Sequence, residues 1–441
     1  MEFFSVFIFV REMKKLLSIF MVTVLLMVVI LSNIVVNAVV IPKISYARLV
    51  SYDDSRKDGV IGTNGRGVVA LRFDDYQDAF GAKIYPLLIE RGLPCSMALI
   101  SRFNTEQPWG KGTTWSQVRD WNRNGVEMWS HGTDHKDYSK KGYEGLYSQI
   151  VTSKLEIEKQ NIKVVGWVLP GVAPAPNKLP LYNGLTKPSD YDSTVGRLLM
   201  QTYSLTEAYA YYGPRILPTH VFHGLNHYTV SDGGMTLASA IATIDVAIEN
   251  KVGIEIMCHP GNLDKPGKMT LSDFTILLDY IKTQWDNCSI EVLTPSGLFF
   301  ADPNSSTRFE LTANDSFEGA GSWTGKTIET SGGKTGDNFL RIGNSISNSP
   351  VTQKIDTSDK SRISGEQFVF EGWVRASGNG ITTGGVKINE LNINKVITTV
   401  SFWTRVRFVF CVPQNTKIIT LSLYRSSGDS IDWDDVSIKK I

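Results

Sequence analysis

The sequence contains few cysteines and places them far apart. Four cysteines occur among 441 residues, at positions 95, 258, 288 and 411, and no two of them form a Cys-x-x-Cys pair. This spacing excludes the dense disulfide framework that staples small secreted domains. We therefore expect buried thiols that pack as small apolar side chains, with a disulfide between Cys258 and Cys288 as the alternative.

An excess of charge of one sign is also missing. The sequence has 45 Lys and Arg residues against 44 Asp and Glu residues, which gives a formal net charge of +1. No broad basic field is available to hold a polyanion, so we expect no nucleic-acid partner. A neutral polymer or a small molecule fits this charge balance better.

The N-terminal segment, residues 1–40, is the most biased part of the chain. Met13-Lys14-Lys15 precedes a nearly unbroken apolar run from Leu16 to Val40, which contains the small-residue site Val36-Asn37-Ala38. A positive head, an apolar stretch and a small-residue exit predict a secretory signal peptide. The run is also long enough to remain as an uncleaved membrane anchor. Both interpretations predict an exported protein, either secreted or attached to the membrane at the extracellular surface.

The rest of the chain predicts more than one domain, because a single core usually stops growing at about 250 to 300 residues. After a linker over residues 41–66, short apolar runs alternate with segments of helical period from Gly67 to Phe300, which is the pattern of β/α units. Parallel strands of this kind place loop chemistry at their C-terminal ends. We predict strands at 68–73, 95–100, 126–130, 164–169 and 253–258, and helices at 78–91, 115–124 and 147–160.

Residues 301–307 are small and polar, which predicts a second linker. Beyond it, strand patterns separated by glycine, serine and asparagine replace the helical period. The pattern predicts an all-β antiparallel sandwich over residues 308–441, which we expect to fold as an independent module. Its predicted strands are 339–342, 368–374, 385–388, 403–410, 418–423 and 433–438.

Three polar clusters follow predicted strands of the α/β region. Asp74 and Asp75 end one strand, His131 and His135 follow another, and His259 ends a later one. Two imidazoles and a carboxylate are the usual ligands of a catalytic divalent metal, and a further carboxylate and histidine supply a proton acceptor and a proton donor. Each cluster alone is explained by a helix cap, a surface pair or a core histidine. Their shared position at strand ends predicts metal-assisted hydrolysis.

The segment Val69–Ile100 resembles the opening of polysaccharide deacetylases, the NodB-homology or carbohydrate esterase family 4 type. The first motif of that family, Thr-Phe-Asp-Asp-Gly, is followed by a helix and a Gly-x-Pro strand, and Phe73-Asp74-Asp75 and Gly92-Leu93-Pro94 match it here. His131–His135 is similar to the second motif and His259 to the last. The resemblance spans Gly67 to Phe300. It implies a distorted (β/α) barrel that hydrolyses N- or O-acetyl groups of an acetylated polysaccharide.

The resemblance also implies a role for each matching residue. Asp75, His131 and His135 would hold the metal, which is usually zinc. Asp74 would be the general base, and His259 the general acid that protonates the leaving amine or alcohol. The predicted substrate-binding residues are Ile256, which corresponds to the lining of the pocket for the acetyl methyl group, and Pro170 and Gly171 of the third motif.

The sequence departs from the family pattern at two motifs. Arg72 and Tyr76 replace the Thr and Gly of the first motif. The third motif normally carries an arginine that pairs with the base, whereas residues 167–171 keep only Pro-Gly. The orientation of Asp74 then depends on an arginine from elsewhere. The arginines considered for this place are Arg72, Arg197 and Arg215.

One competing hypothesis follows from the missing third-motif arginine. Without an arginine partner for the base, the protein would be a catalytically degenerate barrel that only binds glycan. The family's fourth motif usually supplies a carboxylate that binds the acid histidine, and no match to this motif is identified in the sequence.

Three further histidines, His220, His223 and His227, lie close together in the sequence. They either bind a metal themselves or belong to a loop that packs against the cleft.

The tail resembles jelly-roll carbohydrate-binding modules at its two ends. Segment 314–319 with Trp323, and the closing segment 431–438, are similar to the first and last strands of such modules. These strands often share a structural calcium ion, and Glu318 and Asp435 are the matching candidates. Solvated surface carboxylates are the equally weighted alternative.

Overall fold

The computed structural model describes residues 59–104, 110–135, 142–171, 185–319, 321–325, 327–343, 349–359 and 363–441, which all belong to one compact unit. The predicted export segment, residues 1–40, lies outside these ranges. No helix within the described ranges combines the length and the apolar character needed to cross a membrane.

The N-terminal region is built on a parallel sheet, which confirms the predicted α/β barrel. The strands run in the order β7-β6-β5-β4-β3-β2-β9-β8, and β10 pairs with the start of β2. All eight residues of β2 are buried, as expected for a parallel strand covered on both faces. The strands are β2 Gly67–Asp74, β3 Cys95–Leu99, β4 Val126–Ser130, β5 Val164–Val168, β6 Thr206–Tyr211, β7 His223–Leu225, β8 Tyr228–Thr229, β9 Gly253–Cys258 and β10 Ile290–Leu293.

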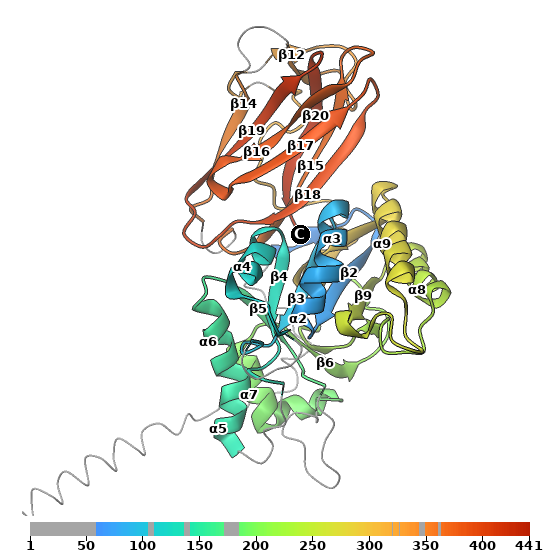
Figure 1. The fold of residues 1–441 in the computed structure, drawn as a ribbon, viewed down its shortest axis with the longest axis vertical. Coiled ribbons are helices and arrows are strands. Elements are labelled where there is room, and N and C mark those ends of the chain that lie inside the picture. Colours follow the sequence, from blue (N-terminus) through green and yellow to red (C-terminus); the bar gives the residue numbers. More distant parts are fainter. Residues whose placement is uncertain are drawn as a thin grey trace, which may run out of the picture. The chain divides into compact units, whose positions relative to one another are not determined.

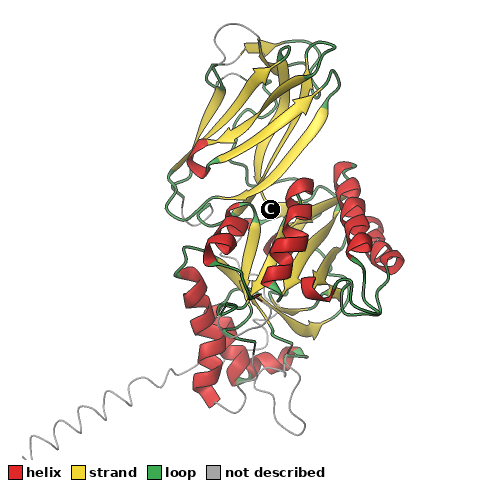
Figure 2. Ribbon diagram, in the orientation of Figure 1, coloured by secondary structure: helices red, strands yellow, loops and turns green. Residues whose placement is uncertain are grey.

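Helices flank this sheet (Figures 1 and 2). The segment predicted as one helix at 78–91 forms α2, a π-helical turn and α3, and ends at Gly92 with a left-handed φ of 61°. Segment 147–160 likewise contains a π-helical turn. The helices are α2 Gln77–Ala79, η3 Phe80–Ile84, α3 Tyr85–Arg91, α4 Trp115–Arg123, α5 Gly142–Tyr147, η6 Ser148–Thr152, α6 Ser153–Glu158, η7 Pro188–Asp192, α7 Thr194–Thr202, α8 Leu237–Asn250, η8 Pro260–Asn262, α9 Leu271–Asp286 and α10 Pro295–Phe300.

The C-terminal region consists of two antiparallel sheets around one apolar core, as predicted. The sheets have the orders β12-β13-β20-β15-β18 and β14-β19-β16-β17, and the rings of Phe370 and Phe408 stack between strands at 4.8 Å. One short helical turn, η9 Asn389–Leu391, interrupts the strands. The strands are β12 Thr327–Glu329, β13 Phe339–Ile342, β14 Val351–Asp356, β15 Gln367–Ala376, β16 Thr382–Ile388, β17 Ile393–Thr399, β18 Thr404–Cys411, β19 Ile418–Ser427 and β20 Ile431–Lys440.

The two segments predicted as linkers meet next to each other. Strand β1, Ile61–Gly62, pairs in parallel with β11, Ala301–Asp302. The backbone N–H of Gly62 donates to Thr307 at 2.7 Å, and a Cβ atom at Gly62 would lie 2.5 Å from that carbonyl oxygen. Glycine is therefore required where the chain entering the barrel passes the chain leaving it.

Strand β18 of the sandwich packs against segments that precede barrel strands. Arg407 stacks over the ring of Trp285 at 4.0 Å and pairs with Asp286 at 2.8 Å, just before β10. Gly92 precedes β3 and Gly125 precedes β4, and a Cβ atom at either would come within 3 Å of β18. The sandwich thus contacts the N-terminal ends of the barrel strands.

All four cysteines are free thiols. Cys258 is buried whereas Cys288 is exposed, so the alternative disulfide between them is wrong. The prediction of buried thiols holds for Cys95, Cys258 and Cys411, and fails for Cys288, which follows the end of α9.

Candidate metal centre

Two tight turns bring the predicted ligands to one edge of the sheet. Asp75 follows β2 with a φ of 58°, and His131 follows β4 and is succeeded by Gly132 with a φ of 84°. His135 also has a left-handed φ, of 55°. Because β2 and β4 are parallel and flank β3, their C-terminal ends lie on the same edge of the sheet.

The three side chains converge in a buried position. Asp75 is 4% exposed and His131 is 2% exposed. Nε2 of His131 lies 3.6 Å from Oδ1 of Asp75, and Nε2 of His135 lies 3.5 Å from Oδ2. Candidate ligand atoms of the three residues all lie within 4.8 Å of one another, and no other such group occurs among the residues that the structure describes.

The chemistry of this donor set fits a divalent metal. Nδ1 of His131 donates to the carbonyl of Val168 at 3.0 Å, which leaves the lone pair of Nε2 facing Asp75. Burial lowers the pKa of His131 to about 4 against the opposing charge of Asp75, so this imidazole is neutral at neutral pH. Oδ1 of Asp75 is buried and accepts no hydrogen bond from a described residue. A buried carboxylate oxygen without a donor is costly, and a metal ion would satisfy it.

Asp74 lies beside the three ligands and is held by Arg72. It is 4% exposed, and the guanidinium donates from Nε to Oδ1 at 2.8 Å and from Nη2 to Oδ2 at 3.1 Å. Burial alone would raise the pKa of Asp74, but Arg72, with further contributions from His131 and His259, lowers the pKa well below its usual range. Asp74 is therefore ionised and can accept a proton.

His259 approaches the ligands from the end of β9. Its Nε2 lies 4.0 Å from Oδ2 of Asp75, and its Nδ1 lies 2.8 Å from Oδ2 of Asp232. Burial lowers the pKa of His259, but the hydrogen bond to Asp232 and the charges of Asp74, Asp232 and Asp75 outweigh burial and raise the pKa. The imidazole is thus supported as a proton donor.

Asp232 is the residue in contact with His259 that the sequence analysis did not identify. It follows Val230 and Ser231 after β8, and Asn262 also donates to it at 2.7 Å. Strand β8 has only two residues, so no strand pattern marks this position. The backbone N–H of His259 donates to Ser231 at 2.7 Å, which fixes the two segments against each other.

The three arginines considered as partners of the base have different positions. Arg72 contacts Asp74 directly. Arg215 pairs with Glu207 and Glu255, deeper in the barrel. Arg197 lies in helix α7 and donates to the backbone carbonyl of Asp192, which precedes that helix. Of the three arginines, Arg72 is therefore the one with a hydrogen bond to Asp74 in the described structure.

The predicted substrate-binding residues lie near this edge, and their roles stay predictions. Pro170 is buried beside the second cluster, since a Cβ atom at Gly132 would lie 3.6 Å from it, and Gly171 is exposed. Ile256 pairs with Leu71, whereas the next residue, Met257, pairs with Arg72. Side chains alternate between faces, so Met257 is the residue of β9 that shares the face of Arg72.

The three further histidines do not form a common metal group among the described residues. His220 is exposed, and Nδ1 of His223 lies 3.2 Å from the hydroxyl of Thr206. Nδ1 of His227 accepts from Nη2 of Arg72 at 2.8 Å. Only His227 therefore reaches the neighbourhood of the candidate site, as part of the packing around Arg72.

In the sandwich, Glu318 and Asp435 bind neighbouring residues of one loop. Glu318 accepts the backbone N–H groups of Asp337 at 3.0 Å and Asn338 at 2.8 Å, and the hydroxyl of Thr335 donates to Asp435 at 2.5 Å. The two carboxylates thus fix the loop between β12 and β13. A calcium ion shared by them stays a prediction.

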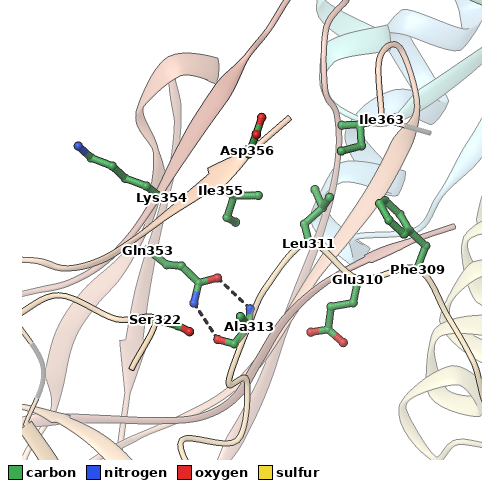
Figure 3. Close-up of a pocket in the computed structure, with 10 residues that line it drawn as sticks. All are labelled: Phe309, Glu310, Leu311, Ala313, Ser322, Gln353, Lys354, Ile355, Asp356 and Ile363. Carbon is green, nitrogen blue, oxygen red and sulfur yellow. Dashed lines mark hydrogen bonds between the residues drawn. The ribbon is translucent and has the colours of Figure 1, made fainter. Parts of the chain in front are cut away.

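The sandwich also contains a cavity of about 310 Å³. Figure 3 shows that the amide of Gln353 is bonded in both directions to the backbone of Ala313, at 2.7 and 3.0 Å. That polar group is therefore occupied within the protein, unlike Oδ1 of Asp75 in the barrel. The lining residues are Phe309, Glu310, Leu311, Ala313, Ser322, Gln353, Lys354, Ile355, Asp356 and Ile363.

Comparison with protein families matches residues 61–176 to polysaccharide deacetylase. Comparison with curated proteins finds no match. Among solved structures, the chain is similar to the Xyl-CE4 domain of a multidomain xylanase from the hindgut metagenome of Trinervitermes trinervoides, with 16% identity over 55% of this chain and 96% of that chain and a TM-score of 0.35. It is also similar to a family 4 acetyl xylan esterase from Clostridium thermocellum in complex with a cobalt ion, with 14% identity, 53% and 90% coverage and a TM-score of 0.34. The CBM22-1–GH10 modules of a Clostridium thermocellum endo-1,4-beta-D-xylanase, complexed with xylohexaose, match at 19% identity over 31% of this chain and only 29% of that one, with a TM-score of 0.25.

Proposed function

We propose that the protein is an exported, metal-dependent hydrolase that removes N- or O-acetyl groups from a polysaccharide. The match of residues 61–176 to polysaccharide deacetylase supports this proposal. The observation that carries this proposal is the buried convergence of Asp75, His131 and His135 beside a proton acceptor, Asp74. His259, steadied by Asp232, supplies a proton donor on the same edge of the sheet.

The metal would be held by the carboxylate of Asp75 and by Nε2 of His131 and His135, and zinc is the metal we propose. When bound, a divalent ion at such a site polarises the acyl carbonyl and lowers the pKa of water. The fixed tautomer of His131 and the unsatisfied Oδ1 of Asp75 support this assignment.

Proton transfer is divided between Asp74 and His259. Asp74 is ionised, so its carboxylate is available to accept a proton from the attacking water. The water oxygen bonds to the acyl carbon, and the bond from that carbon to the sugar nitrogen or oxygen breaks. His259 then donates its Nε2 proton to the leaving amine or alcohol, while Asp232 stabilises the protonated imidazole.

Substrate contact is assigned to residues around this edge. Met257 shares a face with Arg72 and lies two residues before His259, so we add it to Ile256, Pro170 and Gly171 as a candidate lining residue. The sandwich is proposed to bind polysaccharide, with calcium at Glu318 and Asp435 as a structural ion. Its contact with the N-terminal ends of the barrel strands keeps it away from the chemistry and supports a tethering role.

Measuring acetate release from acetylated xylan, chitin and peptidoglycan oligosaccharides tests this function. We expect release that stops with a chelator and returns with added zinc. Release that is unaffected by the chelator would contradict the metal assignment. Glycan binding without acetate release from any of the polymers would favour the competing hypothesis of a degenerate, adhesive barrel.

A further inference from the structure

We propose that Arg72 is a positioning residue of this site, which fixes the Asp74 carboxylate in the orientation required to accept a proton. This inference rests on the proposed function, because it assigns a task to Asp74. It follows from how Arg72 is placed and held, and it accounts for a site without an arginine in its third motif.

The position of Arg72 follows from the geometry of a β-strand. Residues two apart in a strand point to the same face, so Arg72 and Asp74 of β2 both face the barrel interior. The side chain of Arg72 is 1% exposed. Its planar fork meets the carboxylate with two parallel bonds, of 2.8 and 3.1 Å, which fix both the distance and the rotation of the carboxylate.

The guanidinium group of Arg72 also forms hydrogen bonds with three residues other than Asp74. Nη1 of Arg72 donates to Glu255 at 2.6 Å and also to Glu207. Nη2 donates to Nδ1 of His227 at 2.8 Å, so the imidazole of His227 acts as an acceptor there. With each guanidinium nitrogen engaged, Arg72 cannot rotate without breaking several buried bonds. Asp74 therefore binds to a fixed group.

This buried cluster contains one more carboxylate than it has arginines. Three carboxylates, from Asp74, Glu207 and Glu255, face the guanidinium groups of Arg72 and Arg215. Glu207 and Glu255 each bridge both arginines, whereas Asp74 pairs with Arg72 only. Asp74 is therefore the carboxylate of this cluster with the fewest arginine partners, and it is next to the candidate ligand Asp75 in the sequence.

Arg215 provides a matched control within the same cluster. It is buried and pairs with Glu207 at 3.0 Å and Glu255 at 2.5 Å, as Arg72 pairs with the same two residues. No hydrogen bond or ion pair of the described residues joins Arg215 to Asp74. Replacing either arginine by lysine keeps one positive charge but removes the planar fork. Of the two substitutions, only Arg72→Lys removes a guanidinium group that binds Asp74.

The test compares Arg72→Lys with Arg215→Lys in the full-length, metal-loaded protein. For each variant we would determine the crystal structure, the metal content, the thermal midpoint, and kcat and KM for acetate release. We expect Asp74 to leave its wild-type orientation only in Arg72→Lys. We also expect kcat of that variant to fall by about a hundredfold, the scale of a misplaced catalytic group, with metal content and KM unchanged.

Three results separate this inference from its alternatives. An unchanged Asp74 in Arg72→Lys, or equal losses of kcat in both variants, would overturn it and leave Arg72 a structural residue. If Arg72→Lys does not fold, Arg72→Gln combined with Glu207→Gln keeps the net charge of the cluster, and the same displacement of Asp74 is expected. A displaced Asp74 in a protein whose wild type releases no acetate would support the positioning role and refute the proposed function.

Discussion

Two clusters of arginine and carboxylate groups, one in each region of the molecule, use the same chemistry differently. In the sandwich, Asp432 is fully buried and accepts from Arg341 at 2.7 and 2.9 Å and from Arg375 at 3.0 Å. In the barrel, Arg72 makes two bonds to Asp74. Two arginines bind Asp432 in the first cluster, and one of them also pairs with Glu329 at 3.6 Å, whereas the second cluster has three carboxylates and two arginines.

The difference concerns how many acceptor sites the carboxylate proposed as the base and the carboxylate inside the sandwich sheet still have free. A carboxylate has about four acceptor sites, and three of those of Asp432 are used by two arginines within the sheet. Asp74 keeps acceptor capacity and lies next to three converging ligands. A buried ion pair alone is therefore no sign of function. The sign is a partly satisfied carboxylate beside a set of metal donors.

The largest expected effect comes from removing the charge of the base. Asp74→Asn keeps the size of the side chain but cannot accept a proton, so we expect kcat to fall by about a thousandfold, within the range of general acid–base catalysis. Metal content should stay at the wild-type level, because Asp74 is not among the ligands. Kinetics and metal analysis of the same preparation check this, and full activity would exclude Asp74 as the base.

His259 is expected to contribute less, since leaving-group protonation is one step of the reaction. His259→Ala should lower kcat by about a hundredfold.

Asp232→Asn tests whether Asp232 keeps His259 protonated. Asp232 raises the pKa of His259. Because the proton donor must be protonated to act, activity is lost as the pH rises through that pKa. Without Asp232 the alkaline limb of kcat/KM should move to lower pH. An unmoved limb in the pH profile would show that another group titrates there.

The sandwich cluster should respond in stability and not in turnover. Asp432→Asn removes the charge that two arginines share, and we expect the free energy of unfolding to fall by about 2 kcal/mol, as for a lost hydrogen bond to a charged group. Urea unfolding measures this loss, while kcat on soluble oligosaccharides should equal that of the wild type. A parallel drop in kcat would mean that the two clusters are coupled.

The contact between the two regions should have the smallest effect. Arg407→Ala removes the stack on Trp285 and its bond to Asp286, which we expect to cost about 1 kcal/mol of stability. Because this contact lies at the N-terminal ends of the barrel strands, kcat on soluble substrates should not change. A reduced kcat in a folded variant would show that the sandwich influences the site.

The parts that sequence patterns predicted are those with strong local signals. Strands β4 and β9 have the predicted limits, because their residues form uninterrupted buried runs. Asp75, His131 and His259 directly follow buried strands, so the parallel fold brings them together. Asp74 is the last residue of β2, and His135 lies in the loop after β4. Strand β17 was not predicted, since Asn394 and Lys395 interrupt its short apolar run.

Long-range pairing explains what the sequence did not predict. Asp232 lies 27 residues from His259 and follows a strand too short to recognise. Arg72 was one of three open choices, although it lies only two residues from Asp74 in the same strand. What the sequence did not show is the set of partners that hold Arg72 in place, such as Glu207, which is 135 residues away. Such partners are fixed by the register of the barrel, which no local pattern encodes.

The central claim is that Asp75, His131 and His135 bind one divalent metal ion. Elemental analysis by mass spectrometry tests this metal binding. The full-length protein is purified without added metal and then loaded with zinc. We expect about one ion per chain in the wild type and in Asp74→Asn, and almost none in the variant that combines His131→Ala with His135→Ala. Equal metal content in the double variant and the wild type would contradict it.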